Sequence, residues 1–401
     1  MAMLSSENSV RADGLGHPQL AQKLIARIER EGPITFADFM ESALYDPEFG
    51  YYNLEARIGA GGDYWTSPEV HAIFAQTIAR QLAQVAGVIA PTGPFTVIEM
   101  GAGKGTFAEH ILKTFQREQP ALLKRLEYVI IERSAGMAQR QQNHLGPFRQ
   151  AGMSIRWLPD LAVLSSGSVT GAIFSNELVD AFPVHRVVQR PLGLREIFVG
   201  WSASQGFTEI EAPPVAPALQ QYFSRLGIRL EEGQRAEVNL EALRWMRQVA
   251  GCLRRGIVLT IDYGHTAADL YAPLRKAGTL LCYYRQTVSD SPYIRIGQQD
   301  MTAHVNFTSL ALTGQESGLA VTGFTNQLHF LMGLGIEAAF ETVDPESNEA
   351  AFMRRLLQPE GMGSTFKVLV QHKDMPAPTL DGLKSRPFFL DALTSGIPDN
   401  G

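Results

Sequence analysis

Cysteine is nearly absent from this chain, which has only Cys252 and Cys282 among its 401 residues. Two isolated cysteines supply neither a disulfide framework nor the paired spacing of a zinc site. A reducing compartment is therefore expected. The histidines His185, His265 and His329 lack metal-ligand spacing to one another, and no H-E-x-x-H sequence occurs. We predict that the protein holds no metal.

Long apolar runs and an excess of positive charge are also missing. No stretch approaches the roughly 20 apolar residues that span a bilayer. The 35 Lys and Arg against 41 Asp and Glu give a net charge of -6, which lacks the basic footprint of a general nucleic-acid binder. Residues 1–16 contain Glu7 and Asp13 and no apolar core, unlike a secretory signal or transit peptide. We expect a cytoplasmic protein without a nucleic-acid partner or membrane insertion.

Three glycines at alternate positions form the most informative segment. The apolar residues 95–98 lead into Glu99, and Gly101, Gly103 and Gly105 follow. The residues after these glycines are apolar at helical spacing. This order predicts a strand, a tight loop and a helix, the arrangement by which α/β folds present backbone amides to a cofactor.

The details of this loop narrow the choice of cofactor. A dinucleotide fingerprint requires G-x-G-x-x-G, whereas here Thr106 stands in place of the third glycine. A phosphate-binding P-loop requires Ser or Thr after its lysine, whereas Gly105 follows Lys104. A carboxylate such as Glu99 at the mouth of the loop repels a pyrophosphate and suits cationic groups. S-adenosyl-L-methionine carries two cationic groups and no phosphate, so we predict it as the cofactor. The structural alternative is a glycine turn that only lets strand and helix pack closely.

Short apolar runs continue after the loop and predict a parallel sheet. Most of them are followed by a polar or acidic residue, which lies at the edge where open parallel sheets bind ligands. An interruption between the later strands shows strand patterns around turns, then a helix from about Arg235 to Leu253 that ends at Gly256. The predicted sheet strands cover residues 95–98, 128–131, 155–158, 172–174, 257–261 and 366–370, and the strands of the interruption cover 184–190, 196–201 and 207–210.

Helical signals dominate the first part of the chain. Thr35 and Asp38 form a capping box for a short helix, and Ser67-Pro68-Glu69 has the order of a helix start. The polar residues 286–300 are long for a structureless connection and are typical of a lid or binding loop. We predict a helical region over 17–90, a first core part over 91–183, an inserted segment over 184–255, a second core part over 256–372 with an inserted loop at 265–320, and a partly ordered tail over 373–401.

Cofactor contacts are predicted at the loop and at the strand ends. Gly101, Gly103 and Gly105 are the cradle candidates, and Glu99 lies at their entrance. Glu132 follows the second strand, where a doubly wound fold places an acid for ribose hydroxyls; a charge in the first turn of the next helix is the alternative. The remaining candidates are Asp160 for the adenine amine, which as an ordinary loop aspartate needs no such role, and Asn176.

Glu177 and Asp180 are the predicted catalytic acids. They follow the strand at 172–174. If the acceptor is arginine, its guanidinium arrives charged, and carboxylates are needed to clamp it and to redistribute its positive charge over its nitrogens. The alternative is that Asp180 caps a helix beginning near Phe182. His304 is predicted to orient substrate or to shuttle a proton, with a hydrogen-bonded structural histidine as the alternative.

The chain resembles the MidA family of class I S-adenosylmethionine-dependent methyltransferases. The resemblance implies an α/β fold with a Rossmann-like, seven-stranded class I methyltransferase core, an N-terminal helical region and inserted α+β segments. Phe182 and Tyr283-Tyr284-Arg285 depart slightly from the family pattern. The resembling segments are 45–52, 62–69, 99–105, 175–183, 261–264, 278–280, 300–307, 361–363 and 366–369.

The resemblance also implies partners. Mitochondrial relatives support assembly of respiratory complex I and are associated with methylation of an arginine on one of its subunits. It therefore implies a protein substrate, with a complex I subunit as the candidate, and the mitochondrial matrix as the location in a eukaryote. A homodimer is a further expectation. Two other functions stay open at this point: an assembly factor or chaperone with little turnover, and a nicotinamide-dependent oxidoreductase.

Overall fold

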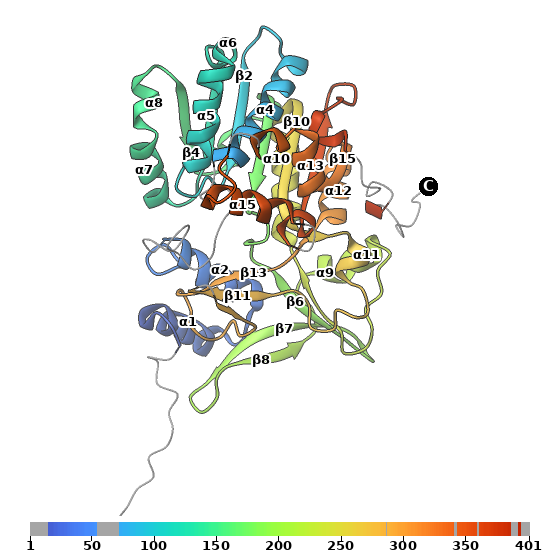
Figure 1. Cartoon of the computed structure of the whole chain (residues 1–401). Coiled ribbons are helices and arrows are strands. Elements are labelled where there is room, and N and C mark those ends of the chain that lie inside the picture. Colours follow the sequence, from blue (N-terminus) through green and yellow to red (C-terminus); the bar gives the residue numbers. More distant parts are fainter. Residues whose placement is uncertain are drawn as a thin grey trace, which may run out of the picture.

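The computed structural model describes residues 15–53, 72–285, 287–340, 343–358, 361–385 and 392–393. Figure 1 shows two assemblies, a large sheet flanked by helices in the upper part and a second group of strands and helices below it. The predicted start of a helix at Ser67-Pro68-Glu69 lies outside the described residues.

The large sheet has eight strands. Seven follow one another in the order β15-β16-β10-β5-β2-β3-β4, and the eighth, β14 (Val305–Asn306), pairs with the end of β10. Strands β10, β5, β2, β3 and β4 are parallel, while β16 is antiparallel to both of its neighbours. The predicted α/β class with a parallel-rich sheet is confirmed. The bounds are β2 Phe95–Met100, β3 Leu126–Ile131, β4 Ser154–Leu158, β5 Val169–Asn176, β10 Leu253–His265, β15 Ala320–Asn326 and β16 Phe366–Lys373.

Helices cover both faces of this sheet. Alternate residues of a strand point to opposite faces, so Val97 packs with α4 and α5 while its neighbour Ile98 packs with α10 and α12. Both faces are buried, which explains the continuous apolar strand sequences. The helices around the sheet are α4 Ala72–Ile89, α5 Thr106–Glu118, α6 Pro120–Leu123, α7 Ala135–His144, α8 Gly146–Gln150, α10 Leu240–Cys252, α12 Phe307–Glu316, α13 Gln327–Gly333, α14 Glu337–Phe340, α15 Asn348–Leu357 and α16 Met362–Thr365.

The second assembly joins segments far apart in the sequence. Its sheet has the order β1-β7-β6-β9, with β8 paired to β7, and a three-stranded sheet has the order β12-β11-β13. One hydrophobic cluster contains residues of α1, α2, β7 and β13. The bounds are α1 Pro18–Glu31, β1 Ile34–Thr35, α2 Phe36–Tyr45, β6 His185–Arg190, β7 Gly193–Ser202, β8 Gly206–Ala212, α9 Pro217–Arg225, β9 Arg235–Val238, α11 Ala267–Leu270, β11 Leu281–Tyr284, β12 Thr287–Ser289 and β13 Asp300–Thr302.

Local signals predicted several of these elements and missed others. The Thr35 side chain accepts from the Asp38 amide at the start of α2, as the capping box predicts. The helix predicted from Arg235 is wrong in its first turn, where β9 pairs with β6 and Asn239 then caps α10. Gly256 lies inside β10 rather than ending that helix. Pairing between distant strands overrides local helical periodicity here. The division of the chain into five segments stays a prediction.

Gly171 lies where two strands of the sheet approach too closely for a side chain. A Cβ atom there would lie 1.8 Å from the backbone oxygen of Thr96 on β2. We expect Gly171→Ala to lower the free energy of unfolding by about 3 kcal/mol or more, measured by urea unfolding followed by circular dichroism. Gly87→Ala is the control, since an alanine on α4 meets nothing within 4 Å and is expected to stabilise the helix by about 1 kcal/mol. A Gly171→Ala midpoint equal to wild type would contradict the close approach.

Candidate functional site

The glycine loop connects β2 to α5 and has left-handed backbone at each predicted glycine. The φ angles are +69° at Gly101, +53° at Gly103 and +84° at Gly105. Gly105 is also the N-cap residue of α5, and its amide donates to the Ala102 oxygen at 2.8 Å. Only glycine adopts such angles at little steric cost. The predicted strand, loop and helix are confirmed, and the loop lies at the positive end of the α5 dipole.

The Glu99 carboxyl group lies inside the protein rather than at an open mouth of the loop. Glu99 is 2% exposed. The Tyr128 hydroxyl donates a hydrogen bond to Glu99 Oε2 at 2.7 Å. Glu99 faces the same side of β2 as the buried Val97, which is why it points inward. Burial raises the pKa of Glu99 to about 7, and the Tyr128 hydrogen bond opposes this rise. Its contact with a cationic cofactor stays a prediction.

We expect Glu99→Gln to stabilise the protein at pH 8. Because the pKa of Glu99 is about 7 in the folded protein against an ordinary 4.5, its contribution to stability falls as pH rises from about 4.5 to about 7 and stays low above that. From this difference in pKa, the variant should gain about 3 kcal/mol at most in free energy of unfolding at pH 8. Glutamine still accepts from Tyr128, and the gain should nearly vanish at pH 4.5. Urea unfolding at both pH values measures it. An equal gain in stability at pH 4.5 and pH 8 would refute the raised pKa of Glu99 as the cause.

Glu132 is joined to the glycine loop through Gln141, a residue that sequence reasoning missed. Glu132 Oε2 accepts from Gln141 Nε2 at 3.0 Å, and the same nitrogen donates to the Gly103 oxygen at 2.8 Å. Glu132 Oε1 accepts from the Ser134 amide at 2.9 Å, just before α7. This last bond fits the helix-start alternative and leaves the ribose role a prediction. The only sequence signal for Gln141 is its spacing of four residues from the buried Met137.

Asp160 is exposed at the end of β4, and its Oδ1 accepts from the Ala162 amide at 2.7 Å. It therefore caps the short helix η3 (Leu161–Val163). The contact with an adenine amine stays a prediction.

Asn176, the last residue of β5, and the segment that follows it to residue 182 are called the rim loop below. Its Glu177 has a φ of +50°, and Asn176 Nδ2 donates to Glu177 Oε1 at 3.1 Å. Asp180 is 4% exposed. Asn176 Oδ1 and Asp180 Oδ1 are buried and have no hydrogen-bond partner among the residues that the structure describes. No helix begins near Phe182 in this fully described stretch, so the expectation that Asp180 caps one is wrong.

Four carboxyl groups lie together at the rim loop, and we call them the acidic cluster. Burial raises the pKa of Asp180 well above its ordinary value, and the charges of the other three members raise it further. The Tyr263 hydroxyl donates to Asp180 and opposes the rise. Like charges this close cannot all ionise without a cation nearby. The members are Glu177, Asp180, Asp262 and Asp300.

The acidic cluster lies where the two assemblies of Figure 1 meet. The Ala303 amide, just after β13, donates to the Asp180 oxygen at 3.0 Å. The Tyr45 hydroxyl at the end of α2 donates to the Ala181 oxygen at 2.9 Å, and Tyr52 donates to Asp300 Oδ1 at 2.8 Å. The second assembly thus closes over the carboxyl ends of the sheet strands.

His304 pairs with His265, its Nδ1 lying 3.0 Å from His265 Nε2. Its ring meets Tyr263 edge-on, with centroids 5.3 Å apart. Burial lowers the pKa of His304 to about 4 and that of His265 to about 3, so both rings are neutral at pH 7. The His304 role in orientation or proton transfer stays a prediction.

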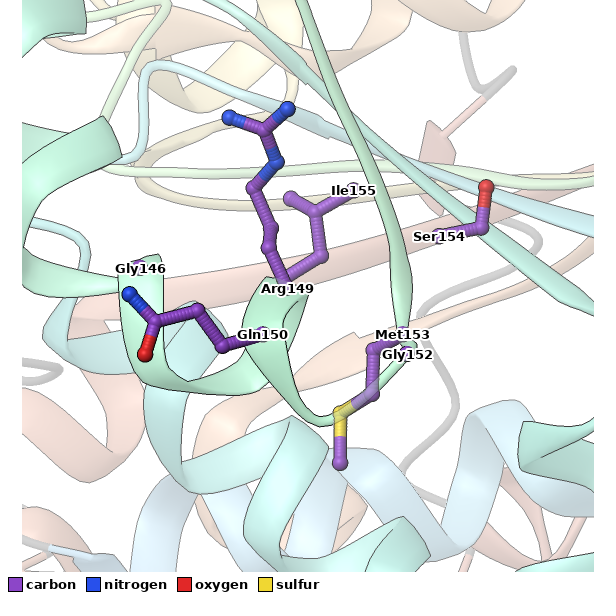
Figure 2. A pocket seen from close by; sticks show the side chains of 7 residues that line it. All are labelled: Gly146, Arg149, Gln150, Gly152, Met153, Ser154 and Ile155. Atoms are coloured by element: carbon purple, nitrogen blue, oxygen red, sulfur yellow. The ribbon is translucent and has the colours of Figure 1, made fainter.

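Other candidate features lie elsewhere. An open hollow of about 560 Å³ lies between α8 and the start of β4, at the amino end of the strand, whereas the glycine loop follows the carboxyl end of β2. Figure 2 shows Arg149, Gln150 and Met153 among its lining. Within the described residues, no group of three or more His, Cys, Asp or Glu could hold a metal ion. Over that same part of the chain, no helix has the length and apolar character to cross a membrane.

Comparison with known proteins now decides the family. The model of the family described as "Putative S-adenosyl-L-methionine-dependent methyltransferase" matches residues 77–325, which hold the glycine loop, the rim loop and β10. The chain belongs to this family. S-adenosyl-L-methionine is accordingly its cofactor, the MidA resemblance is confirmed, and the nicotinamide-dependent alternative is wrong.

Several individual proteins are similar over most of their length. A crystal structure of a Burkholderia thailandensis protein bound to S-adenosyl-homocysteine is 30% identical, with a TM-score of 0.82, covering 96% of this chain and 98% of that one. Human "Protein arginine methyltransferase NDUFAF7, mitochondrial" is 27% identical over 380 residues, covering 86% of this chain and 82% of the human protein. The Drosophila melanogaster homologue is 28% identical over 402 residues, covering 94% and 89%.

The residues present fit this cofactor. A Cβ on Gly101 would lie 2.7 Å from Leu178 Cδ1, so the glycine loop lies this close to the rim loop because Gly101 has no side chain. Asn176 Oδ1 is a buried acceptor without a partner among the described residues, and the ammonium and hydroxyl groups of S-adenosyl-L-methionine are donors. When bound, this cofactor supplies a methyl group on a positively charged sulfur.

Proposed function

We propose that this methyltransferase modifies an arginine side chain of a protein, with Glu177 and Asp180 holding the guanidinium group. The observation that carries the proposal is the acidic cluster at the end of β5, with Asp180 Oδ1 buried and without a partner among the described residues. The names of the human and Drosophila melanogaster relatives support the same acceptor.

The electrostatics of the cluster suit a cation that arrives charged. A guanidinium keeps its proton at any ordinary pH and presents donors in a planar fork that matches carboxylates. Without a cation, burial and mutual repulsion raise the pKa of Asp180. A bound guanidinium would lower that pKa and favour the ionised pair, so binding near pH 7 should release protons. The two carboxylates would orient the attacking nitrogen and exclude water from it.

Labelling of a cell extract tests the acceptor. The purified protein is incubated with extract and S-adenosyl-L-methionine carrying a radiolabelled methyl group, and labelled bands are analysed by mass spectrometry. We expect the label on an arginine of a protein. Label on a lysine, a histidine or a small molecule would refute the arginine acceptor. No label at all, with a stable protein complex retained, would favour an assembly factor with little turnover.

We further propose a respiratory complex I subunit as the protein acceptor, a homodimer as the assembly, and the cytoplasm as the location, or the mitochondrial matrix in a eukaryote. The resemblance to the MidA family supports the first, and the mitochondrial names of the relatives support the matrix. Mass spectrometry of the labelled band tests the first, and light scattering of the purified protein tests the second. A monomer, or a label absent from complex I, would refute the respective proposal.

A further inference from the structure

Asp262, at the end region of β10, makes an unusual set of contacts with the rim loop. Its Oδ2 accepts from the amides of Leu178 at 3.2 Å, Val179 at 2.9 Å and Asp180 at 3.4 Å. Its Oδ1 accepts from the amide of its own neighbour Tyr263 at 2.9 Å. The residue is fully buried, with 0% exposure. One carboxylate thus satisfies three successive amides of a segment that belongs to no helix or strand.

The sheet register explains why Asp262 reaches this loop. Strands β10 and β5 run parallel, with Ile261 opposite Asn176, and the Glu177 amide donates to the Ile261 oxygen at 3.0 Å. Asp262 therefore follows the last residue of β10 that pairs with β5, just as Glu177 follows the last residue of β5 that pairs with β10. The Asp262 side chain therefore reaches from β10 to the rim loop, which begins at the end of β5.

The rim loop needs such support because its backbone is strained. Glu177 has a φ of +50°, a region that a residue with a side chain occupies at a cost of about 1–3 kcal/mol. Such residues persist where the surrounding structure fixes them. Three hydrogen bonds from the amides of the following residues to one buried carboxyl group provide that constraint.

We propose that Asp262 is a positioning residue of this enzyme: by holding the amides of residues 178–180, it places Glu177 and Asp180 for the acceptor. The inference deepens the proposed function and rests on it for the identity of the acceptor group. Asp262 itself acts through the loop backbone and is not assigned a contact with substrate or cofactor. Asparagine cannot fully replace it, because its single acceptor oxygen serves either the rim-loop amides or the Tyr263 amide, and its NH2 group then faces the amide donors on the other side.

Asp262→Asn tests the proposal with two readouts. We expect the rate of methyl transfer into cell-extract protein to fall by about 100-fold, the effect of a misplacement near 1 Å, while the calorimetric affinity for S-adenosyl-homocysteine stays at the wild-type value. Thr260→Val is the matched control, because Thr260 lies on the same strand at 0% exposure and its Oγ1 has no partner among the described residues. That control is expected to keep the wild-type rate.

Hydrogen exchange of the wild-type protein supplies a readout that needs neither a variant nor an acceptor. The amides of Leu178, Val179 and Asp180 should be strongly protected, and Asp262→Asn should speed their exchange while the strand amides of β5 and β10 stay protected. Rapid exchange of these three amides in the wild type would overturn the proposal, as would an unchanged transfer rate in Asp262→Asn. If the label appeared on another residue type, only the arginine acceptor would be refuted. The comparison of Asp262→Asn with wild type would still test the positioning role of Asp262.

Discussion

Asp180→Asn is expected to reduce methyl transfer by at least about 100-fold while leaving the affinity for S-adenosyl-homocysteine unchanged. The reason is that the substitution keeps the volume of the side chain and removes a charge that we assign to the guanidinium clamp. Rates are measured as radiolabelled methyl incorporated into extract protein, and affinity by calorimetry. Asp344→Asn is the control, since Asp344 is an exposed aspartate in the segment before α15.

The stability of Asp180→Asn separates a lost function from a lost fold. The folded protein disfavours an ionised Asp180, whose pKa burial and neighbouring carboxylates raise. Its contribution to stability therefore falls as pH rises above the ordinary aspartate value of 3.8. The variant should consequently unfold at a higher temperature than wild type at pH 8. Lower activity with higher stability is the expected trade-off at a functional site. Wild-type activity in Asp180→Asn would remove this residue from the proposed clamp.

Gly101→Val is expected to weaken S-adenosyl-homocysteine binding by about 100-fold or more. Two observations point to the same result. The backbone at Gly101 has a φ of +69°, where a β-branched residue is an outlier. A Cβ there would lie 2.7 Å from Leu178 Cδ1, so the added side chain would also push the glycine loop away from its position beside the rim loop. Calorimetric titration measures the loss.

Gly167→Val is the matched control for that experiment. Gly167 also has a left-handed backbone, with a φ of +61°, but a Cβ there meets nothing within 4 Å. It lies before β5, at the end of the strand away from the glycine loop. We expect the control to lose stability through backbone strain and to keep its cofactor affinity. Equal losses of affinity in both variants would attribute the effect to general destabilisation rather than to the loop.

The site illustrates which residues a linear pattern can reveal. Strand ends are readable, because an apolar run that stops at Glu132 or Glu177 marks the edge where a parallel sheet binds ligands. The partner of a side chain is not readable when it comes from a distant segment. Gln141 reaches the Gly103 oxygen from α7, and Tyr128 reaches Glu99 across a strand pair. No spacing rule connects such positions.

The sequence by itself determined the cofactor chemistry and the class of fold. Glycines at alternate positions after a buried strand permit few backbone conformations, and those conformations are local properties of the residues. Only the tertiary structure decided which charged side chains are buried and which of them lie together. Glu99 turned inward, Asp262 joined the rim loop from β10, and Asp300 arrived from the second assembly to complete the acidic cluster. Burial and electrostatic repulsion depend on which segments meet in space, and that is set by long-range packing rather than by neighbours in the chain.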